Sequence, residues 1–217
     1  MSGVLIVTGT DTGIGKTVVA AGLAAALGAF YWKPVQAGTA EGTDSLDVAD
    51  LAGLPADRIL PEGYRLALAA SPHLAAEAEG LVLEPGRLAL PDTRPLVVEG
   101  AGGVMVPVRR DPPLFMADLF ALWRAPVLLV ARSGLGTINH SLTSLLALRQ
   151  KGVRVAGLLM VGDAHPDNEA LVPRLGGVPC FGRLPHLDPL DRSSLGAAMA
   201  DHIDIAAVRA AMRDAMA

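Results

Sequence analysis

The sequence predicts a three-layer α/β fold: a doubly wound, mostly parallel sheet of six or seven strands, with a phosphate-binding loop (P-loop) after the first strand. Short apolar runs, such as residues 4–7 and 126–131, alternate with longer helical stretches along the chain. A glycine-rich segment follows the first apolar run and leads into a helical stretch. The length of 217 residues, 51% of them hydrophobic, suits one domain, which we place at residues 1–217.

The first half of the chain shows the alternation clearly. Residues 4–8 are predicted as a buried strand and residues 18–27 as a helix, with Gly28 as its C-cap. A short strand over 30–35 and a polar loop over 36–43 come next. A helix over 44–51 follows, with Asp44 at or near its N-cap. Residues 54–68 are expected to be irregular, residues 71–78 to contain a helix that starts with Ser71 and Pro72, and residues 95–99 to form a buried strand.

The second half repeats the pattern. We predict helices over 114–123, from about 137 to 151, over 167–175 and over 201–217, the last of them amphipathic. Strands are predicted over 126–131, 153–161 and 178–184. A second glycine-bearing turn, residues 134–140, joins a strand to a helix, and its exposed N–H groups would suit an anionic group such as a carboxylate.

The P-loop occupies residues 9–17, which read GTDTGIGKT. Its backbone N–H groups and the following helix N-terminus favour phosphate, the Lys16 ammonium reaches the β- and γ-phosphates, and the Thr17 hydroxyl suits Mg²⁺. The usual pattern has glycine six positions before the lysine; that position is Thr10 here, and Gly9 lies one residue further back. We expect the nucleotide to contact Thr12, Gly13, Ile14, Gly15, Lys16, Thr17 and Val18.

Composition excludes several other classes of protein. A net charge of −4 and a pI near 5.7 argue against a nucleic-acid-binding surface. No uninterrupted run of eighteen apolar residues predicts a membrane span, and no basic segment precedes a signal-type apolar stretch. The single cysteine, Cys180, lies in an apolar run and is expected to be a buried structural thiol. We therefore predict a cytoplasmic protein.

Lys33 is a candidate site residue. Of eighteen basic residues only Lys16, Lys33 and Lys151 are lysines, so a retained lysine suggests a need for a compact ammonium group. Lys33 ends a predicted strand, and ligands of open parallel sheets bind beyond that edge. The interpretation is that Lys33 and the P-loop share one cleft; the alternative is a solvated lysine at a strand end.

Two acidic positions are candidate metal ligands. Asp44 begins a predicted helix, and Glu99 ends a buried strand directly before glycines 100–103. Carboxylates placed beside a nucleotide are ligands that Mg²⁺ accepts. The spacing to residues 51–53 (LAG) favours Asp44 as the metal aspartate, with Asp47 as the second choice.

Five motifs together identify a family resemblance that covers nearly the whole chain. Their order and rough spacing are similar to those of the dethiobiotin synthetase family. The resemblance implies an ATP- and Mg²⁺-dependent ligase of biotin synthesis that converts 7,8-diaminononanoate and CO₂ to dethiobiotin, ADP and phosphate. The motifs are GTDTGIGKT at 9–17, KPVQ at 33–36, SPH at 71–73, EGAGG at 99–103 and GTINH at 136–140.

The resemblance also implies roles for individual residues. Lys33 would be the catalytic lysine, aided by Lys16, and Thr17, Asp44 and Glu99 would surround Mg²⁺. The implied substrate residues are Thr10, Lys33, Ala37, Gly102, Gly136, Ile138 and Asn139, of which the last three would hold the substrate carboxylate across the two-fold interface of a homodimer. Gly102 would also border the nucleotide, and the base would lie against Gly162, Pro185, His186 and Leu187.

Two departures from the family pattern affect these expectations. Ala37 stands where a Ser or Thr is usual, so one hydroxyl on the substrate side is missing, and Thr39 is a candidate replacement. Gly162 stands where many members have an Asn that reads the adenine edge. We therefore hypothesise a relaxed nucleotide preference, with CTP or GTP accepted beside ATP.

Two other classes share this fold. A regulatory ATPase switch of the partitioning or site-selection type would carry an extra lysine early in the P-loop, but Thr10, Asp11 and Thr12 stand there. It would also have a membrane-binding terminal helix, whereas residues 201–217 mix acidic and basic side chains. The synthetase domain of a cobyrinate-type amidase would need an additional glutaminase domain, for which the chain is too short.

Overall fold

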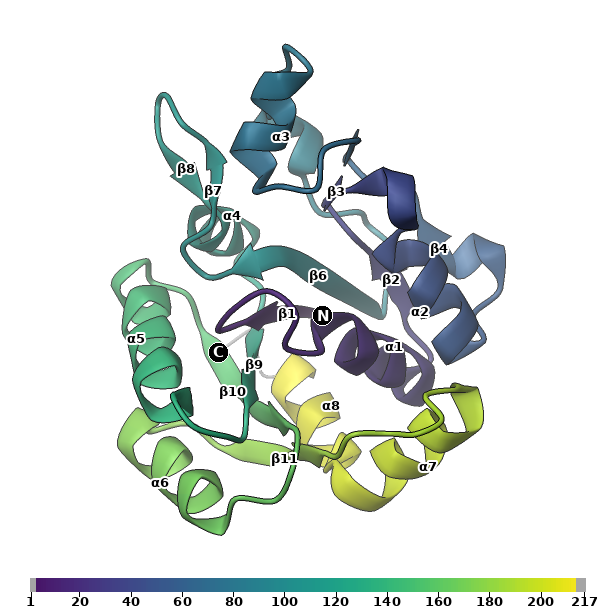
Figure 1. The fold of residues 1–217 in the computed structure, drawn as a ribbon, viewed down its shortest axis with the longest axis vertical. Helices are drawn as coiled ribbons and strands as arrows, with labels where there is room; N and C mark the ends of the chain where they lie inside the picture. The colour runs from purple at the N-terminus through teal and green to yellow at the C-terminus, as the bar shows by residue number, and fades with distance from the viewer. Residues whose placement is uncertain (1–2, 214–217) are drawn as a thin grey trace.

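The computed structural model describes residues 3–213, except for the side chain of Glu41. Its centre is a seven-stranded sheet in which every neighbouring pair of strands is parallel (Figure 1). This arrangement confirms the predicted doubly wound sheet and its strand number. The spatial order is β11 (Cys180–Leu184), β10 (Val155–Val161), β9 (Val127–Arg132), β1 (Val4–Gly9), β6 (Leu96–Gly103), β2 (Phe30–Trp32) and β4 (Ile59–Leu60).

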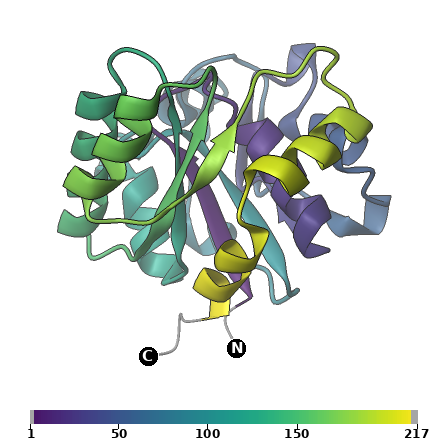
Figure 2. The ribbon, with the colours of Figure 1, turned by 90° about the horizontal axis from the view of Figure 1, so that it is seen from below.

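Helices cover both faces of the sheet, as Figures 1 and 2 show from two directions. One face packs against α1 (Lys16–Leu27), α2 (Asp44–Ala52), α7 (Arg192–His202) and α8 (Ile205–Arg213). The other packs against α3 (Pro72–Ala78), α4 (Met116–Trp123), α5 (Thr137–Gln150) and α6 (Pro166–Gly176). Because side chains alternate along a strand, Leu5 packs on the face that α1 covers and Ile6 on the face that α4 covers.

The predicted strand over 30–35 is interrupted at Lys33 and Pro34. β2 ends at Trp32, and β3 (Val35–Ala37) leaves the main sheet to pair with β5 (Tyr64–Leu66). Proline has no N–H to donate to a ladder, so it ends the pairing of β2 at this point. The break places Lys33 on a corner at the carboxyl edge of the sheet.

Residues 54–68 are more ordered than predicted, and the prediction of an irregular segment was wrong. They contain a 3₁₀ turn, η2 (Ala56–Arg58), followed by β4 and β5. Both strands are only two or three residues long, and flanking prolines hide them in the sequence. Further short 3₁₀ turns occur at η1 (Thr39–Glu41) and η3 (Pro85–Leu88).

The strand that carries Glu99 is longer than predicted. β6 continues through Gly103, so the glycines after Glu99 belong to the strand instead of forming a turn. After it, β7 (Pro107–Arg109) and β8 (Leu114–Phe115) form an antiparallel hairpin that was not predicted. For this reason the helix expected from Leu114 begins two residues later, at Met116.

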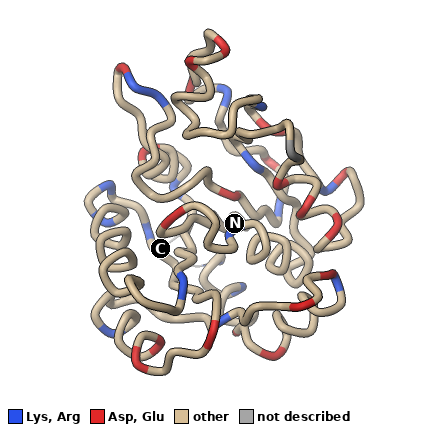
Figure 3. The backbone as a smooth tube through the Cα atoms, in the orientation of Figure 1, with Lys and Arg blue, Asp and Glu red and all other residues tan. Residues whose placement is uncertain are grey.

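The C-terminal part contains two helices where one was predicted. α7 was missed, and the helix expected over 201–217 corresponds in part to α8; residues 214–217 lie outside the described residues. Within residues 3–213, no helix has the length and hydropathy needed to cross a bilayer. Acidic and basic residues are interspersed along the backbone (Figure 3).

Candidate active site

The carboxyl ends of the central strands bring the predicted site residues together. The register pairs Val7 with Glu99 across β1 and β6, and Trp32 with Val98 across β2 and β6. Lys33 therefore follows Trp32 at the level of Glu99, although the two residues are 66 positions apart. A parallel sheet aligns its carboxyl ends, so the loop after β1 opens at the same edge.

The P-loop has the conformation that its glycines allow. Gly13 and Gly15 have φ values of 69° and 91°, in the left-handed region that side chains disfavour. The Lys16 Nζ donates a hydrogen bond of 2.7 Å to the Asp11 carbonyl oxygen and so lies across the loop. Burial, and then the charge of Lys33, lower the pKa of Lys16 to about 8. Phosphate oxygens would replace the lost solvation and stabilise the charged form.

Lys33 lies between two carboxylates. Its Nζ is 2.6 Å from Asp44 Oδ2 and 2.8 Å from Glu99 Oε1, and it also approaches the Gly100 carbonyl oxygen at 3.3 Å. Burial opposes the charge of Lys33, but Glu99 and Asp44 outweigh it, and the pKa of Lys33 is raised. The ammonium group is therefore charged at neutral pH and held in a fixed position, because Lys33 is only 4% exposed.

Three side chains with oxygen atoms that can bind a metal, those of Thr17, Asp44 and Glu99, converge beside Lys33. Thr17 Oγ1 donates toward Glu99 Oε1 at 3.0 Å and Asp44 Oδ1 at 3.3 Å. Hydroxyl and carboxylate oxygens are hard donors, the type that Mg²⁺ prefers. Among the described residues no group of three or more His, Cys, Asp or Glu side chains is placed to hold a metal. A cation here would thus take its remaining ligands from water and a nucleotide, as Mg²⁺ usually does.

Two buried residues that the sequence analysis did not assign to the site support these carboxylates. The Tyr31 hydroxyl donates to Glu99 Oε2 at 2.8 Å, and its pKa is raised well above the usual value by burial first and Glu99 second. Gln36 Oε1 accepts from the Asp44 backbone N–H at 3.0 Å. The available signal was the spacing Tyr31-x-Lys33, since alternate positions share one face of a strand.

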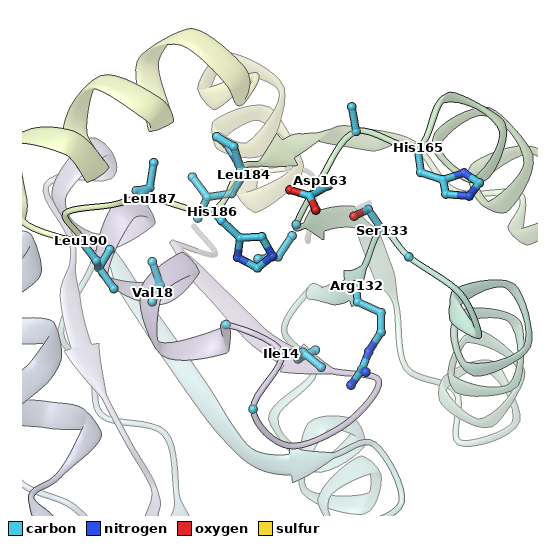
Figure 4. A pocket seen from close by; sticks show the side chains of 17 residues that line it. Ile14, Val18, Arg132, Ser133, Asp163, His165, Leu184, His186, Leu187 and Leu190 are labelled. Carbon is cyan, nitrogen blue, oxygen red and sulfur yellow. The ribbon is translucent and has the colours of Figure 1, made fainter.

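One cavity, called cavity A here, extends from the P-loop to the loops after β9, β10 and β11 (Figure 4). Its volume is about 690 Å³. Apolar side chains, including Val18 and Leu187, line one part, and the polar side chains of Ser133 and His186 point into it. The predicted nucleotide residues on its wall are Gly13, Ile14, Gly15, Val18, Gly162, Pro185, His186 and Leu187.

Gly162 has little freedom to bind a base through its own backbone. Its N–H donates to the Leu184 carbonyl oxygen at 3.0 Å, and its carbonyl oxygen accepts from Arg183 Nη1 at 2.8 Å. A Cβ at this position would lie 2.8 Å from Ser133 Oγ, and φ is 122°. The loop is therefore built around the absence of a side chain at residue 162.

The second cavity, cavity B, lies on the other side of the P-loop and has a volume of about 700 Å³. It shares Gly13, Gly15 and Val18 with cavity A, so the two meet at the phosphate position. Ser71, which carries a hydroxyl group, lies on its wall. The Ser71 Oγ is 3.0 Å from Nδ1 of His73. The predicted site residues that line it are Thr12, Lys16, Thr17, Lys33, Ala37, Asp44, Glu99 and Gly102.

Some predicted residues lie elsewhere. Gly136, Ile138 and Asn139 line a third cavity, with Leu135 and Leu146, which does not include Lys33. Thr10 and Thr39 are not on the walls of cavity A or B. The exposed side chain of Asp47 is likewise outside both cavities, whereas Asp44 contacts Lys33 and Thr17. Thr43, one residue before Asp44, caps α2 by accepting from the Leu46 N–H.

The fold resembles solved P-loop ATPases. A ParA family ATPase from Chlorobium tepidum aligns with a TM-score of 0.54 and 12% identity, over 91% of this chain and 90% of that one. The cell division ATPase MinD from Pyrococcus furiosus aligns with a TM-score of 0.53 and 17% identity, over 91% and 89%. At such identities the likeness shows the shared architecture alone.

Sequence comparison is more specific. A family model described as an AAA domain matches residues 4–194. The ATP-dependent dethiobiotin synthetase BioD of Novosphingobium aromaticivorans is 57% identical over 196 residues, which are 90% of this chain and 94% of that protein. The enzyme of the same name from Rhodopseudomonas palustris (strain BisA53) is 53% identical over 206 residues, 94% and 96% of the two chains. With a nucleotide-binding P-loop beside a buried lysine and two carboxylates, this chain belongs to the family of ATP-dependent dethiobiotin synthetases.

Proposed function

We propose that this protein closes the ureido ring of dethiobiotin from 7,8-diaminononanoate and CO₂, with ATP converted to ADP and phosphate. The observation that carries the proposal is the meeting of two cavities at the P-loop, with Lys33 on the wall of one of them. A nucleotide base would occupy cavity A, and a phosphoryl acceptor would occupy cavity B. Family membership supplies the identity of that acceptor.

The reaction needs three bond-forming steps. One amine of the diamine attacks CO₂, loses a proton and becomes a carbamate. A carbamate oxygen attacks the γ-phosphorus of ATP, and ADP leaves. The second amine attacks the carbamate carbon, loses a proton and expels phosphate, which closes the ring. Charge builds on oxygen atoms throughout, so fixed cations and N–H groups are the groups that lower the barrier.

The residues around cavity B match these needs. The ammonium group of Lys33 would neutralise the carbamate and the mixed anhydride, and Lys16 with the P-loop N–H groups would neutralise the phosphates. Asp44, Glu99 and Thr17 would hold Mg²⁺, which supplies charge neutralisation at the β- and γ-phosphates. Because Asp44 Oδ2 and Glu99 Oε1 also contact Lys33, these two acids serve both cations.

A homodimer is part of this proposal. The carboxylate end of the diamine would bind the N–H groups at Gly136, Ile138 and Asn139, which lie in a cavity separate from Lys33. The neighbouring Leu135 and Leu146 are 98% and 61% exposed, as expected for an apolar surface that a second copy covers. The partner copy would then complete the site.

Two further expectations remain proposals. We infer that residues 1–217 act as one P-loop domain in the cytoplasm, where ATP is available. The relaxed nucleotide preference is supported by the apolar wall of cavity A and by the engaged backbone of Gly162. A panel of ATP, CTP and GTP at equal concentrations tests it, and an ATP preference above about a hundredfold would contradict it, since that corresponds to nearly 3 kcal/mol of base readout.

Phosphate release from ATP–Mg²⁺ tests the main proposal. We expect release that requires both 7,8-diaminononanoate and bicarbonate, and that collapses in Lys33→Ala. Lys151→Ala is the matched control, because Lys151 pairs with Asp118 away from both cavities. Release that is indifferent to the diamine would refute the ligase and favour an ATPase of another kind.

A further inference from the structure

Glu99 is a buried carboxylate whose two oxygens have different partners. Oε1 contacts Lys33 Nζ at 2.8 Å and Thr17 Oγ1 at 3.0 Å, both of which also line cavity B. Oε2 accepts a hydrogen bond of 2.8 Å from the Tyr31 hydroxyl. Tyr31 is fully buried and Glu99 is 1% exposed, so water cannot readily replace this contact.

Tyr31 lies behind the site and does not line either cavity. It belongs to β2, where its Cα is paired with Val97 of β6, two residues before Glu99. Its ring packs in the core beneath the P-loop helix α1, together with Val7 and Val97. The strand therefore fixes the ring, and the ring in turn fixes the hydroxyl beside Glu99 Oε2.

We propose that Tyr31 is a positioning residue that sets the orientation of the Glu99 carboxylate and thereby the Mg²⁺ affinity of the nucleotide complex. This inference rests on the proposed function, in which Glu99 is a metal ligand. The last torsion of a glutamate side chain is broad, so the carboxylate plane is determined by its partners. Tyr31 holds Oε2 on the core side and leaves Oε1 facing Thr17, where the cation would bind.

Loss of the hydroxyl would remove the partner of Oε2 without removing any cavity wall. Phenylalanine has the same ring, so the core around Val97 stays filled. A group that hydrogen-bonds a metal ligand typically contributes 10- to 100-fold in metal affinity. We therefore expect Tyr31→Phe to weaken divalent metal binding by about tenfold or more, with the affinity for metal-free ADP nearly unchanged.

Mn²⁺ binding to the ADP complex measures this directly, with free Mn²⁺ followed by electron paramagnetic resonance. The matched control is Tyr64→Phe, because Tyr64 is the other tyrosine of the chain and is also a buried residue, whose hydroxyl accepts from the Glu84 N–H at 3.0 Å. Tyr64 lines neither cavity, and its removal should leave Mn²⁺ affinity unchanged. An unchanged Mn²⁺ affinity in Tyr31→Phe would overturn the proposal.

A second measurement covers the case in which Tyr31→Phe does not fold. In Tyr64→Phe, Tyr31 is the only tyrosine, so growth with 3-fluorotyrosine labels that single ring. We expect its ¹⁹F resonance to shift when Mg²⁺ is added to the ADP complex, because the cation acts on Glu99. A resonance that does not respond to Mg²⁺ would overturn the proposal.

A double-mutant cycle separates this role from a general structural one. If Tyr31 acts through Glu99, Tyr31→Phe should change Mn²⁺ affinity much less in a Glu99→Gln background than in the wild type. An equal effect in both backgrounds would refute the coupling. Wild-type enzyme that binds ADP but no Mn²⁺ would instead refute the metal site of the proposed function, so the two failures are distinguishable.

Discussion

Nucleotide affinity should depend on pH through Lys16. In the free protein, burial and the nearby Lys33 lower the pKa of Lys16 to about 8. Bound phosphates add negative charge beside the ammonium group and raise its pKa. Binding therefore takes up a proton wherever the free enzyme has lost one, and affinity falls as the pH rises above about 8.

The size of the effect follows from that value. If the pKa in the complex stays at or above about 10.5, the dissociation constant of ADP–Mg²⁺ should rise roughly 20-fold between pH 7.5 and pH 9.5. Proton uptake should be about 0.5 per ADP at pH 8 and about 0.9 at pH 9. The phosphates of ADP are already ionised over this range, so they do not contribute to the slope.

Isothermal titration calorimetry in two buffers of different ionisation enthalpy measures both quantities at once. Lys16→Arg is the control, because a guanidinium keeps its charge over the whole range and should bind ADP with little pH dependence. Lys33, whose pKa is raised, stays charged and does not add a second slope. Binding by the wild type that is constant from pH 7.5 to 9.5, or an equal slope in Lys16→Arg, would refute the reasoning.

Three further outcomes can be checked. Lys33→Met should lower the free energy of unfolding by roughly 3 kcal/mol in urea titrations, since it leaves Glu99 buried without its cation. The pKa of Lys33 is raised in the folded protein, so the stability that Lys33 contributes is fully present below pH 10.5. The difference in unfolding free energy between the wild type and Lys33→Met should therefore be constant from pH 7 to 9. Gly182→Ala should lower the free energy of unfolding by about 2–4 kcal/mol, because φ is 128° and a Cβ would overlap the His202 carbonyl. Gly196→Ala, in α7 with open space around it, should raise the free energy of unfolding by up to about 1 kcal/mol. Equal effects of the two substitutions would contradict this. Leu146→Glu should shift the protein to monomer in analytical ultracentrifugation and reduce ring closure, and an unchanged sedimentation coefficient would remove α5 from the proposed interface.

Local patterns predicted most of the residues that meet at the candidate site, because each signal is short-range. The order of residues 9–17 encodes the P-loop, since positive φ values at Gly13 and Gly15 are a local property of the backbone. Lys33 directly follows β2, Asp44 begins α2 and Glu99 lies in β6, and a parallel sheet places such positions near one edge. Their convergence within 2.6–2.8 Å agrees with that expectation.

Features that depend on long-range pairing were missed. β4, β5, β7 and β8 are two or three residues long, too short for a hydrophobic period, and exist because a partner strand is present. α7 begins at an Asp191 cap but has weak amphipathic patterning, since its contacts are with α1, α2 and β11. Tertiary packing overrode local propensity in each case.

By itself the sequence determined the fold class, the phosphate-binding loop and the family resemblance, because these are written in ordered motifs and in the alternation of strands and helices. The tertiary structure alone decided which side chains support those motifs. The hydrogen bond from Tyr31 to Glu99 joins residues 68 positions apart, and the Asp44 backbone N–H donates to Gln36 Oε1 across the segment between β3 and α2. The Tyr31-x-Lys33 spacing indicates only that the two side chains share a face, and the contacts themselves exist because the folded register brings these polar groups together.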